Sequence, residues 1–235
     1  MGQPGTEGTG FDKFAREYTR IHARNIRLSG ETPEFFARYK IDDVARCSAE
    51  FGLIPRQILD FGSGVGVSIP HWRSLLPDTE LVCMDISERS LEIARQQYPH
   101  GAMFIPYDGR SIPLPAGQFD IVFAACVFHH IEPGQQIVLL KELHRVMTAD
   151  GLLFIFEHNP LNPLTVRAFN TCEFDQDAVL IRPGLLRRLT LEAGFREISL
   201  AYRIFFPGIL GRLRPMERFL TWLPAGAQYR LIAQP

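Results

Sequence analysis

Three glycines follow a short apolar stretch and are spaced so that a ligand could approach the backbone. Residues 58–61 read Ile-Leu-Asp-Phe, and Gly62, Ser63, Gly64 and Gly66 follow within the next five positions. Glycine has no Cβ, so it permits a tight turn and close approach, and a helix starting after the turn points its amides at the same place. Such a turn also occurs where a strand simply needs left-handed residues before a helix. The glycines therefore indicate a ligand site only together with other polar residues.

Acidic residues stand at the ends of the first three predicted strands. Asp60 belongs to the first strand, Asp85 ends the second, and Asp108 with Gly109 follows the third. The carboxyl ends of parallel strands share one edge of a sheet, and a carboxylate there can accept hydrogen bonds from both ribose hydroxyls. Alternatively, Asp60 could cap the following helix and Asp108 could form a local turn ahead of Gly109.

Histidines follow the next two predicted strands. His129 and His130 come after the fourth strand, and His158 after the fifth. An imidazole exchanges protons near neutral pH, so His129 or His158 could act as a general base toward an acceptor hydroxyl. The alternative is a histidine that is only hydrogen-bonded or that contacts a cofactor. The spacing of these histidines does not match known metal-ligand motifs, and we predict no metal.

Alternating strands and helices would bring these residues together. Short β-branched runs that alternate with helical stretches predict βαβ units and a parallel sheet. The expected strands span 57–61, 80–84, 102–106, 119–125 and 151–157, and period-two alternation over 198–206 and 229–233 predicts an antiparallel terminal pair. The expected helices run from Phe11 to the Ser29-Gly30 stop, from Pro33 to Phe51, from the Ser87 cap to before Pro99, from Pro133 to Asp150 and from Arg182 to Ala193.

The ordered motifs resemble those of class I S-adenosylmethionine-dependent methyltransferases. The turn with Asp60 upstream resembles the first motif of that family, and 112–122, 127–131 and 141–151 resemble its later motifs. A dinucleotide-binding turn would carry glycine or alanine at position 67, which is Val67, so an NAD-type oxidoreductase is the less favoured alternative. A non-catalytic protein that binds an adenosyl ligand is a third possibility.

The resemblance implies an α/β, Rossmann-like, seven-stranded, mostly parallel sheet with helices on both faces, an antiparallel last strand and an N-terminal helical cap. S-adenosyl-L-methionine would pass its methyl group to a small molecule, with an oxygen nucleophile in sugar, polysaccharide or natural-product metabolism favoured. The implied cofactor-binding residues are Asp60, Gly62, Ser63, Gly64, Gly66, Asp85, Ile86, Asp108, Gly109, Ala125 and Cys126. Tyr18 and His22 share a face of the first helix and are candidates for a pocket lid, with core packing as the alternative for Tyr18.

Composition limits the partners. The chain has 235 residues, a formal net charge of -1 and a sequence pI of about 6.7, so nucleic acid is a disfavoured partner. Four scattered cysteines predict free thiols and a cytoplasmic location. The longest apolar run, 121–128, is too short to cross a membrane. The oligomeric state cannot be read from these features.

We predict a disordered tail over 1–10 and one methyltransferase domain over 11–235. That domain would comprise a helical cap over 11–52 and a core over 53–235 with inserted segments at 159–181 and 207–225. The first insertion should overhang the crevice after the fifth strand. The second carries apolar and arginine side chains, and we expect Leu213, Phe219 and Trp222 to be buried on the sheet edge. Its alternative role is contact with a membrane surface or a lipid-like acceptor.

Overall fold

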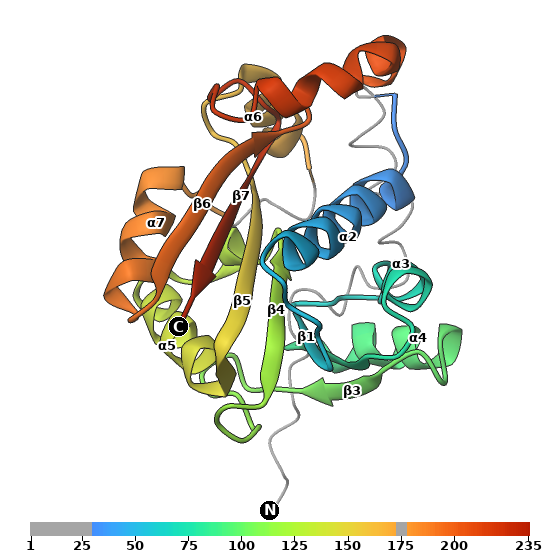
Figure 1. Cartoon of the computed structure of the whole chain (residues 1–235), viewed down its shortest axis with the longest axis vertical. Helices are drawn as coiled ribbons and strands as arrows, with labels where there is room; N and C mark the ends of the chain where they lie inside the picture. The colour runs from blue at the N-terminus through green and yellow to red at the C-terminus, as the bar shows by residue number, and fades with distance from the viewer. Residues whose placement is uncertain (1–29, 173–177) are drawn as a thin grey trace, which may run out of the picture.

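Seven strands form one mixed sheet (Figure 1) in the computed structural model, which describes residues 30–172 and 178–235. The strand order is β3-β2-β1-β4-β5-β7-β6, and β7 runs antiparallel to both β5 and β6 while the remaining pairs are parallel. This confirms the predicted Rossmann-like sheet with its antiparallel last strand. The strands are β1 (Gln57–Phe61), β2 (Glu80–Asp85), β3 (Met103–Pro106), β4 (Phe119–Ala125), β5 (Met147–His158), β6 (Arg196–Arg203) and β7 (Gln228–Gln234).

Helices cover both faces of the sheet. On one face Ile41 of α2 and Trp72 of α3 pack against strand residues, and on the other face Leu139 of α5 and Leu186 of α7 do so. Successive side chains of a strand point to opposite sides of the sheet. Because helices cover both sides, side chains on both faces of the strands are buried. The α-helices are α2 (Pro33–Glu50), α3 (Ile69–Leu75), α4 (Glu88–Gln97), α5 (Pro133–Val146), α6 (Pro163–Asn170) and α7 (Pro183–Glu192), and two 3-10 segments are η3 (Phe128–His130) and η5 (Gly208–Phe219).

Side-chain caps begin three of the helices. The Thr32 hydroxyl accepts a hydrogen bond from the Phe35 amide at the start of α2, and the Ser87 hydroxyl accepts one from the Ser90 amide at the start of α4. Both helix starts were predicted from these residues. Asn162 caps α6 in the same way, inside the segment predicted only as a polar insertion.

The end of α5 differs from the prediction. The helix was expected to run to Asp150, but it ends at Val146, and β5 starts at Met147. Met147 is buried, has extended backbone and pairs with Phe119, and the register of the β4–β5 ladder shifts immediately afterwards. Burial of Met147 and this irregular pairing therefore decide the boundary, where the helical pattern of the sequence alone would continue.

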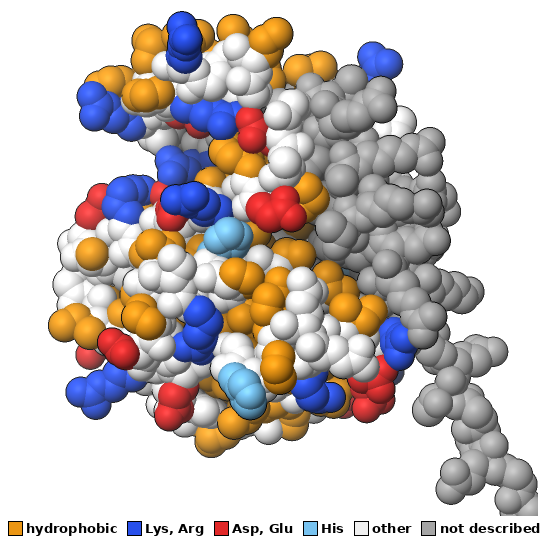
Figure 2. All heavy atoms as spheres, turned by 90° about the vertical axis from the view of Figure 1, so that its right-hand side faces the viewer, with side chains coloured by type: hydrophobic (Ala, Val, Ile, Leu, Met, Phe, Trp, Pro, Cys, Tyr) orange, Lys and Arg blue, Asp and Glu red, His pale blue; other side chains and the backbone are white. Residues whose placement is uncertain are grey.

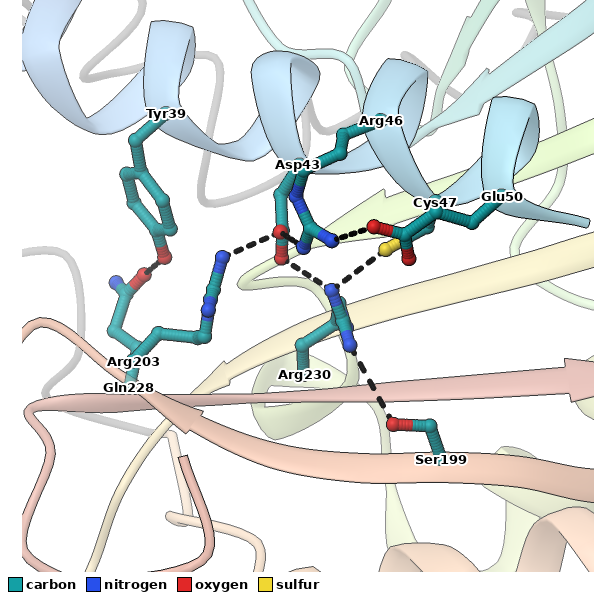
Figure 3. A network of polar contacts seen from close by, with 9 residues as sticks. All are labelled: Tyr39, Asp43, Arg46, Cys47, Glu50, Ser199, Arg203, Gln228 and Arg230. Carbon is teal, nitrogen blue, oxygen red and sulfur yellow. Dashed lines mark hydrogen bonds and ion pairs between the residues drawn. The ribbon is translucent and has the colours of Figure 1, made fainter. Parts of the chain in front are cut away.

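A buried ionic network joins α2 to the last two strands (Figure 3). Asp43 is 2% exposed, and its carboxylate accepts hydrogen bonds from Arg46 and Arg230, each at 2.5 Å, and from Arg203. The Arg230 guanidinium also donates to the Cys47 thiol at 3.0 Å. The network thus connects α2 with β6 and β7.

The segment 208–222, which we call the η5 lobe, stands away from the core (Figure 2). The expectation that Leu213, Phe219 and Trp222 are buried on the sheet edge is wrong, because their exposed fractions are 39%, 64% and 73%. The lobe is anchored through polar contacts: the Glu217 carboxylate accepts hydrogen bonds from the two backbone amides at 205 and 206, each at 3.0 Å. These hydrogen bonds hold the lobe in place while its apolar side chains stay exposed.

Some predictions lie outside the described residues, including the disordered tail, the first helix, Tyr18 and His22. Within 30–172 and 178–235, no helix combines the length and the apolar content required to cross a bilayer. The division into a cap and a core with insertions stays a prediction.

Candidate functional site

The glycine turn has the backbone conformation that the sequence predicted. Gly62, Gly64 and Gly66 all have positive φ, at 73°, 54° and 78°. A Cβ added to Gly62 would lie 2.4 Å from a methyl carbon of Val127, whereas one added to Gly64 would meet nothing within 4 Å. Gly62 is therefore required by packing against the loop after β4, while Gly64 leaves its surroundings open.

Asp85 brings the end of β2 to the glycine turn. One oxygen of its carboxylate accepts a hydrogen bond from the Gly64 amide at 2.8 Å, and the other accepts one from the Ser87 amide at 2.9 Å. Gly109 also lies here, since a Cβ added to it would be 3.7 Å from a methyl carbon of Ile86. The structure thus brings together the turn, Asp85, Ile86 and Gly109, as the sequence predicted.

Asp108 lies on the same side but is exposed and engaged by its own turn. Its carboxylate accepts hydrogen bonds from the backbone amides of Arg110 and Ser111, each at 2.8 Å. The hydrogen bonds from Ser111 and then Arg110 lower the pKa of Asp108 below its ordinary value. The local-turn role that we considered for this residue is present in the structure, and a contact with adenine stays a prediction.

Asp60 is a buried carboxylate beside the turn. It is 2% exposed, and one of its oxygens accepts hydrogen bonds from the Ser68 hydroxyl at 2.5 Å and from the Trp72 indole at 3.1 Å. Burial raises the pKa of Asp60 to about 6, against the opposing effects of these hydrogen bonds and of the positive charge on Lys40. The nearby Ser63 hydroxyl is also buried and makes no hydrogen bond within the described residues.

Lys40 is a buried cation that the sequence analysis missed. The side chain is 7% exposed, and its ammonium lies 3.8 Å from the Cys126 sulfur and 5.8 Å from the centre of the Tyr39 ring. Among residues 30–172 and 178–235, no carboxylate forms an ion pair with it, although its charge acts on the Asp60 carboxylate. A signal existed in the sequence, because Phe36, Lys40 and Asp43 follow the buried stripe of α2 at helical spacing, and charged residues on a buried stripe are rare.

Cys126 directly follows β4 and has a strained backbone. It has a φ of 59°, in the left-handed region that residues other than glycine rarely adopt, and its amide donates to the Phe156 carbonyl at 2.7 Å. Gln228 donates to its sulfur at 3.7 Å and accepts a hydrogen bond from the Tyr39 hydroxyl. Strain of this kind is concentrated at ligand and active sites, which fits the predicted location of Ala125 and Cys126 beside the cofactor.

His129 and Glu157 form a buried pair at the carboxyl ends of β4 and β5. The imidazole Nδ1 lies 2.6 Å from one oxygen of Glu157, and the backbone amides of Val127 and Phe128 donate to the other oxygen at 3.1 and 2.8 Å. Burial alone would raise the pKa of Glu157, but His129 reverses this effect and the pKa lies below its ordinary value. Because the Glu157 carboxylate accepts a hydrogen bond from Nδ1–H, the neutral imidazole carries its lone pair on Nε2.

The other predicted histidines surround this pair. The His129 ring centre lies 4.1 Å from that of His130, 5.4 Å from that of His158 and 5.6 Å from that of Phe169 in α6. The sequence analysis named the histidines and missed Glu157, although a single acidic residue directly after the apolar run 152–156 was the available signal. No group of three or more His, Cys, Asp or Glu arranged for a metal ion occurs in the described ranges, and the absence of a metal stays a prediction.

Known proteins resemble both the sequence and the fold of this chain. Residues 59–155 match the family model described as a methyltransferase domain. A malonyl-[acyl-carrier protein] O-methyltransferase of Legionella pneumophila is 33% identical over 163 residues, which cover 68% of this chain and 51% of the relative. A demethylmenaquinone methyltransferase of Thermus thermophilus is 30% identical over 109 residues, covering 45% of this chain and 49% of the relative.

The chain spans about half the length of these two curated relatives and a smaller share of the length of other relatives. Among solved structures, a Thermotoga maritima S-adenosylmethionine-dependent methyltransferase described as a possible histamine N-methyltransferase superposes with a TM-score of 0.66 at 19% identity. That match covers 95% of this chain and 97% of the other, and it concerns the fold. With the glycine turn, the carboxylate at the end of β2 and the strand order in agreement, the chain belongs to the class I S-adenosylmethionine-dependent methyltransferases.

Proposed function

We propose that this protein transfers the methyl group of S-adenosylmethionine to an oxygen nucleophile of a small molecule. The observation that supports an oxygen acceptor is the His129–Glu157 pair at the carboxyl ends of β4 and β5. A hydroxyl must lose its proton when it is methylated, and an imidazole oriented by a carboxylate is suited to take that proton. The names of two relatives specify a malonyl-[acyl-carrier protein] oxygen and demethylmenaquinone as acceptors. The sugar and polysaccharide acceptors that the sequence resemblance implied stay a prediction.

The buried charges beside the turn fit the two ends of the methionine part of the cofactor. That part carries an ammonium and a carboxylate, and this chain holds a buried carboxylate at Asp60 and a buried ammonium at Lys40. In our proposal Asp60 binds the cofactor's ammonium and Lys40 its carboxylate. A buried cation is costly to maintain, and no carboxylate within 30–172 and 178–235 forms an ion pair with Lys40, which supports this assignment.

The remaining residues would hold the adenosine part. We assign the ribose hydroxyls to Asp85, whose carboxylate already lies at hydrogen-bonding distance from the turn, and the adenine to Ile86 and Gly109. A Cβ added to Gly64 would meet no atom within 4 Å, so a ligand can approach the turn at this position. When bound, the cofactor supplies a methyl carbon activated by a positively charged sulfur.

The protein contributes orientation, a proton acceptor and shelter from water. His129 Nε2 would take the acceptor's proton, while Glu157 keeps the imidazole in the required tautomer and stabilises its charged form. Phe169 packs against His129 and His158 from α6, so it reduces the access of water to the pair. His158 contacts the same cluster and would orient the acceptor.

Replacing Asp85 with alanine should weaken cofactor binding. Loss of a charged hydrogen-bond acceptor costs at least about 1 kcal/mol, or about fivefold in Kd. Titration calorimetry with S-adenosylhomocysteine measures the change. Asp78→Ala is the matched control, because Asp78 is an exposed aspartate just before β2, at the opposite end of that strand. Equal affinities of the two variants would show that the ribose binds elsewhere.

Cofactor affinity should depend on pH through Asp60. The carboxylate pairs with an ammonium only when it is ionised, and its pKa is raised to about 6. As pH falls from about 8 to about 5, affinity for S-adenosylhomocysteine should therefore start to fall near pH 6, with a limiting slope of about tenfold per pH unit. The ordinary carboxyl would lose its charge only near pH 4.

Two variants test the origin of that pH dependence. Asp60→Asn should bind weakly with a nearly flat profile between about pH 5 and 8. Lys40→Met should bind S-adenosylhomocysteine more weakly than the native protein does. Its affinity should also start to fall at a higher pH, because the positive charge of Lys40 acts to lower the pKa of Asp60. A wild-type affinity that is constant across this range would remove Asp60 from the cofactor site.

The acceptor class is tested with cofactor labelled in its methyl group. Transfer to panels of carboxyl, phenol, hydroxyl and amine compounds should favour oxygen acceptors, with S-adenosylhomocysteine as the co-product. Transfer to amines alone would contradict the proposal. Parallel calorimetry with NAD separates it from nicotinamide oxidoreduction, and tight cofactor binding without any methyl transfer would favour the non-catalytic alternative.

A further inference from the structure

The η5 lobe exposes an unusual set of large apolar side chains. Six residues within 208–222 point to solvent, and none of the residues in η5 is buried. Their exposed fractions are Ile209 91%, Leu210 45%, Leu213 39%, Met216 55%, Phe219 64% and Trp222 73%. Scattered exposed apolar residues are ordinary, but six within one short segment form a patch that indicates a binding surface.

A second apolar contribution comes from the start of α6. Leu161 is 50% exposed and Leu164 is 77% exposed. The Asn162 side chain donates to the Ala225 carbonyl at 2.7 Å, which ties this part of the chain to the residues that directly follow the lobe. Figure 1 shows α6 beside the last turns of the lobe, at the end of the molecule where β5 stops. The patch is therefore built by two segments and lies near the carboxyl edge of the sheet.

The charge on the lobe is positive. Arg212 and Arg218 are exposed, and Arg214 is half-buried, where it pairs with Glu31. Glu217 is the acidic residue within 208–222, and its carboxylate is occupied by backbone amides. Figure 2 shows basic and apolar side chains together over this part of the molecule. The solvent-facing side of the lobe thus combines apolar groups with arginines that carry no acidic partner on the lobe.

We propose that the η5 lobe and the start of α6 bind the surface of a membrane that contains anionic lipids. Tryptophan, phenylalanine and aliphatic side chains enter the interface between headgroups and acyl chains, while arginines pair with lipid phosphates. A second copy of the chain is a poorer occupant, because a two-fold contact through this patch would bring Arg212 and Arg218 of both copies into one interface, and Glu217, the acidic residue of the lobe, is occupied by backbone amides. This binding does not depend on methyl transfer, although it would place the carboxyl edge of the sheet next to a lipophilic acceptor.

The experiment uses the full chain and sedimentation with vesicles. The protein should bind vesicles of equal parts phosphatidylglycerol and phosphatidylcholine, bind weakly to pure phosphatidylcholine, and be released by high salt. Trp222 provides a second measure, because its emission should shift to the blue on binding while Trp72 stays in the core. Phe219→Ser with Trp222→Ser should reduce vesicle binding by at least about tenfold, and Arg212→Gln with Arg218→Gln by about fivefold for each arginine.

Matched controls separate the possible outcomes. Ile54→Ser removes an exposed apolar residue that is 87% exposed and lies before β1, and it should leave vesicle binding unchanged. Affinity for S-adenosylhomocysteine, measured on every variant, should also be unchanged and shows that each variant is folded. Absence of vesicle binding by the native chain would overturn the proposal. So would an oligomer in sedimentation analysis that the Phe219→Ser, Trp222→Ser variant dissociates, because the patch would then be a contact between copies.

Discussion

Glu157→Gln is expected to lower kcat by about 100- to 10,000-fold toward an acceptor that must lose a proton. The glutamine can still accept from the amides of Val127 and Phe128, but it no longer presents a carboxylate to His129 Nδ1. Its amide group can donate to Nδ1, which favours the tautomer with the proton on Nε2. The imidazole then cannot take a proton at the required atom. His129→Asn should cause a loss in the same range.

The pH profile distinguishes this role from a structural one. In the native protein the rate should rise with pH as His129 loses its proton. In Glu157→Gln that limb should move to lower pH, because the imidazole loses the carboxylate that favours its protonated form. The Kd for S-adenosylhomocysteine should change much less than kcat. His100→Asn alters an exposed histidine and serves as the control. A native kcat in Glu157→Gln with the same acceptor would refute the assignment of the base.

Asp43→Asn is expected to lower the free energy of unfolding by about 3–5 kcal/mol. The substitution removes the charge that compensates Arg230, which is 5% exposed, and also the shared partner of Arg46 and Arg203 (Figure 3). The Arg230 guanidinium then remains buried without the charge that compensated it, and water cannot solvate it fully, whereas Arg46 keeps its ion pair with Glu50. The shift of the urea midpoint at constant slope measures the loss.

The neighbouring aspartate supplies a matched control. Asp42 is 47% exposed and forms a solvent-facing ion pair with Arg38 at 3.6 Å, so Asp42→Asn should change stability by less than about 1 kcal/mol. A double variant with Asp43→Leu and Arg230→Met should be more stable than Asp43→Asn, because no buried charge is then left alone at these two positions. Equal midpoints for Asp42→Asn and Asp43→Asn would show that the network contributes little.

Much of the site could be predicted because its determinants are local. The positive φ values of Gly62, Gly64 and Gly66 follow from the steric freedom of glycine within a few residues of a strand end. Period-two alternation likewise predicted the antiparallel pair that became β6 and β7. The boundary of α5 could not be predicted in this way, because it depends on the pairing of Met147 with Phe119 across the sheet.

The sequence alone was enough to predict the strand order along the chain, most of the helices, the glycine turn and the position of Asp85 at a strand end, since backbone sterics and short-range periodicity control these features. It did not predict α6, which lies in the segment expected only as a polar insertion. The tertiary structure alone decided which distant residues meet: Lys40 with Cys126, His129 with Glu157, and Asp43 with Arg230. It also decided that the apolar side of the η5 lobe faces solvent. An amphipathic pattern states that an apolar face exists, but only the packing of the whole chain determines what covers that face.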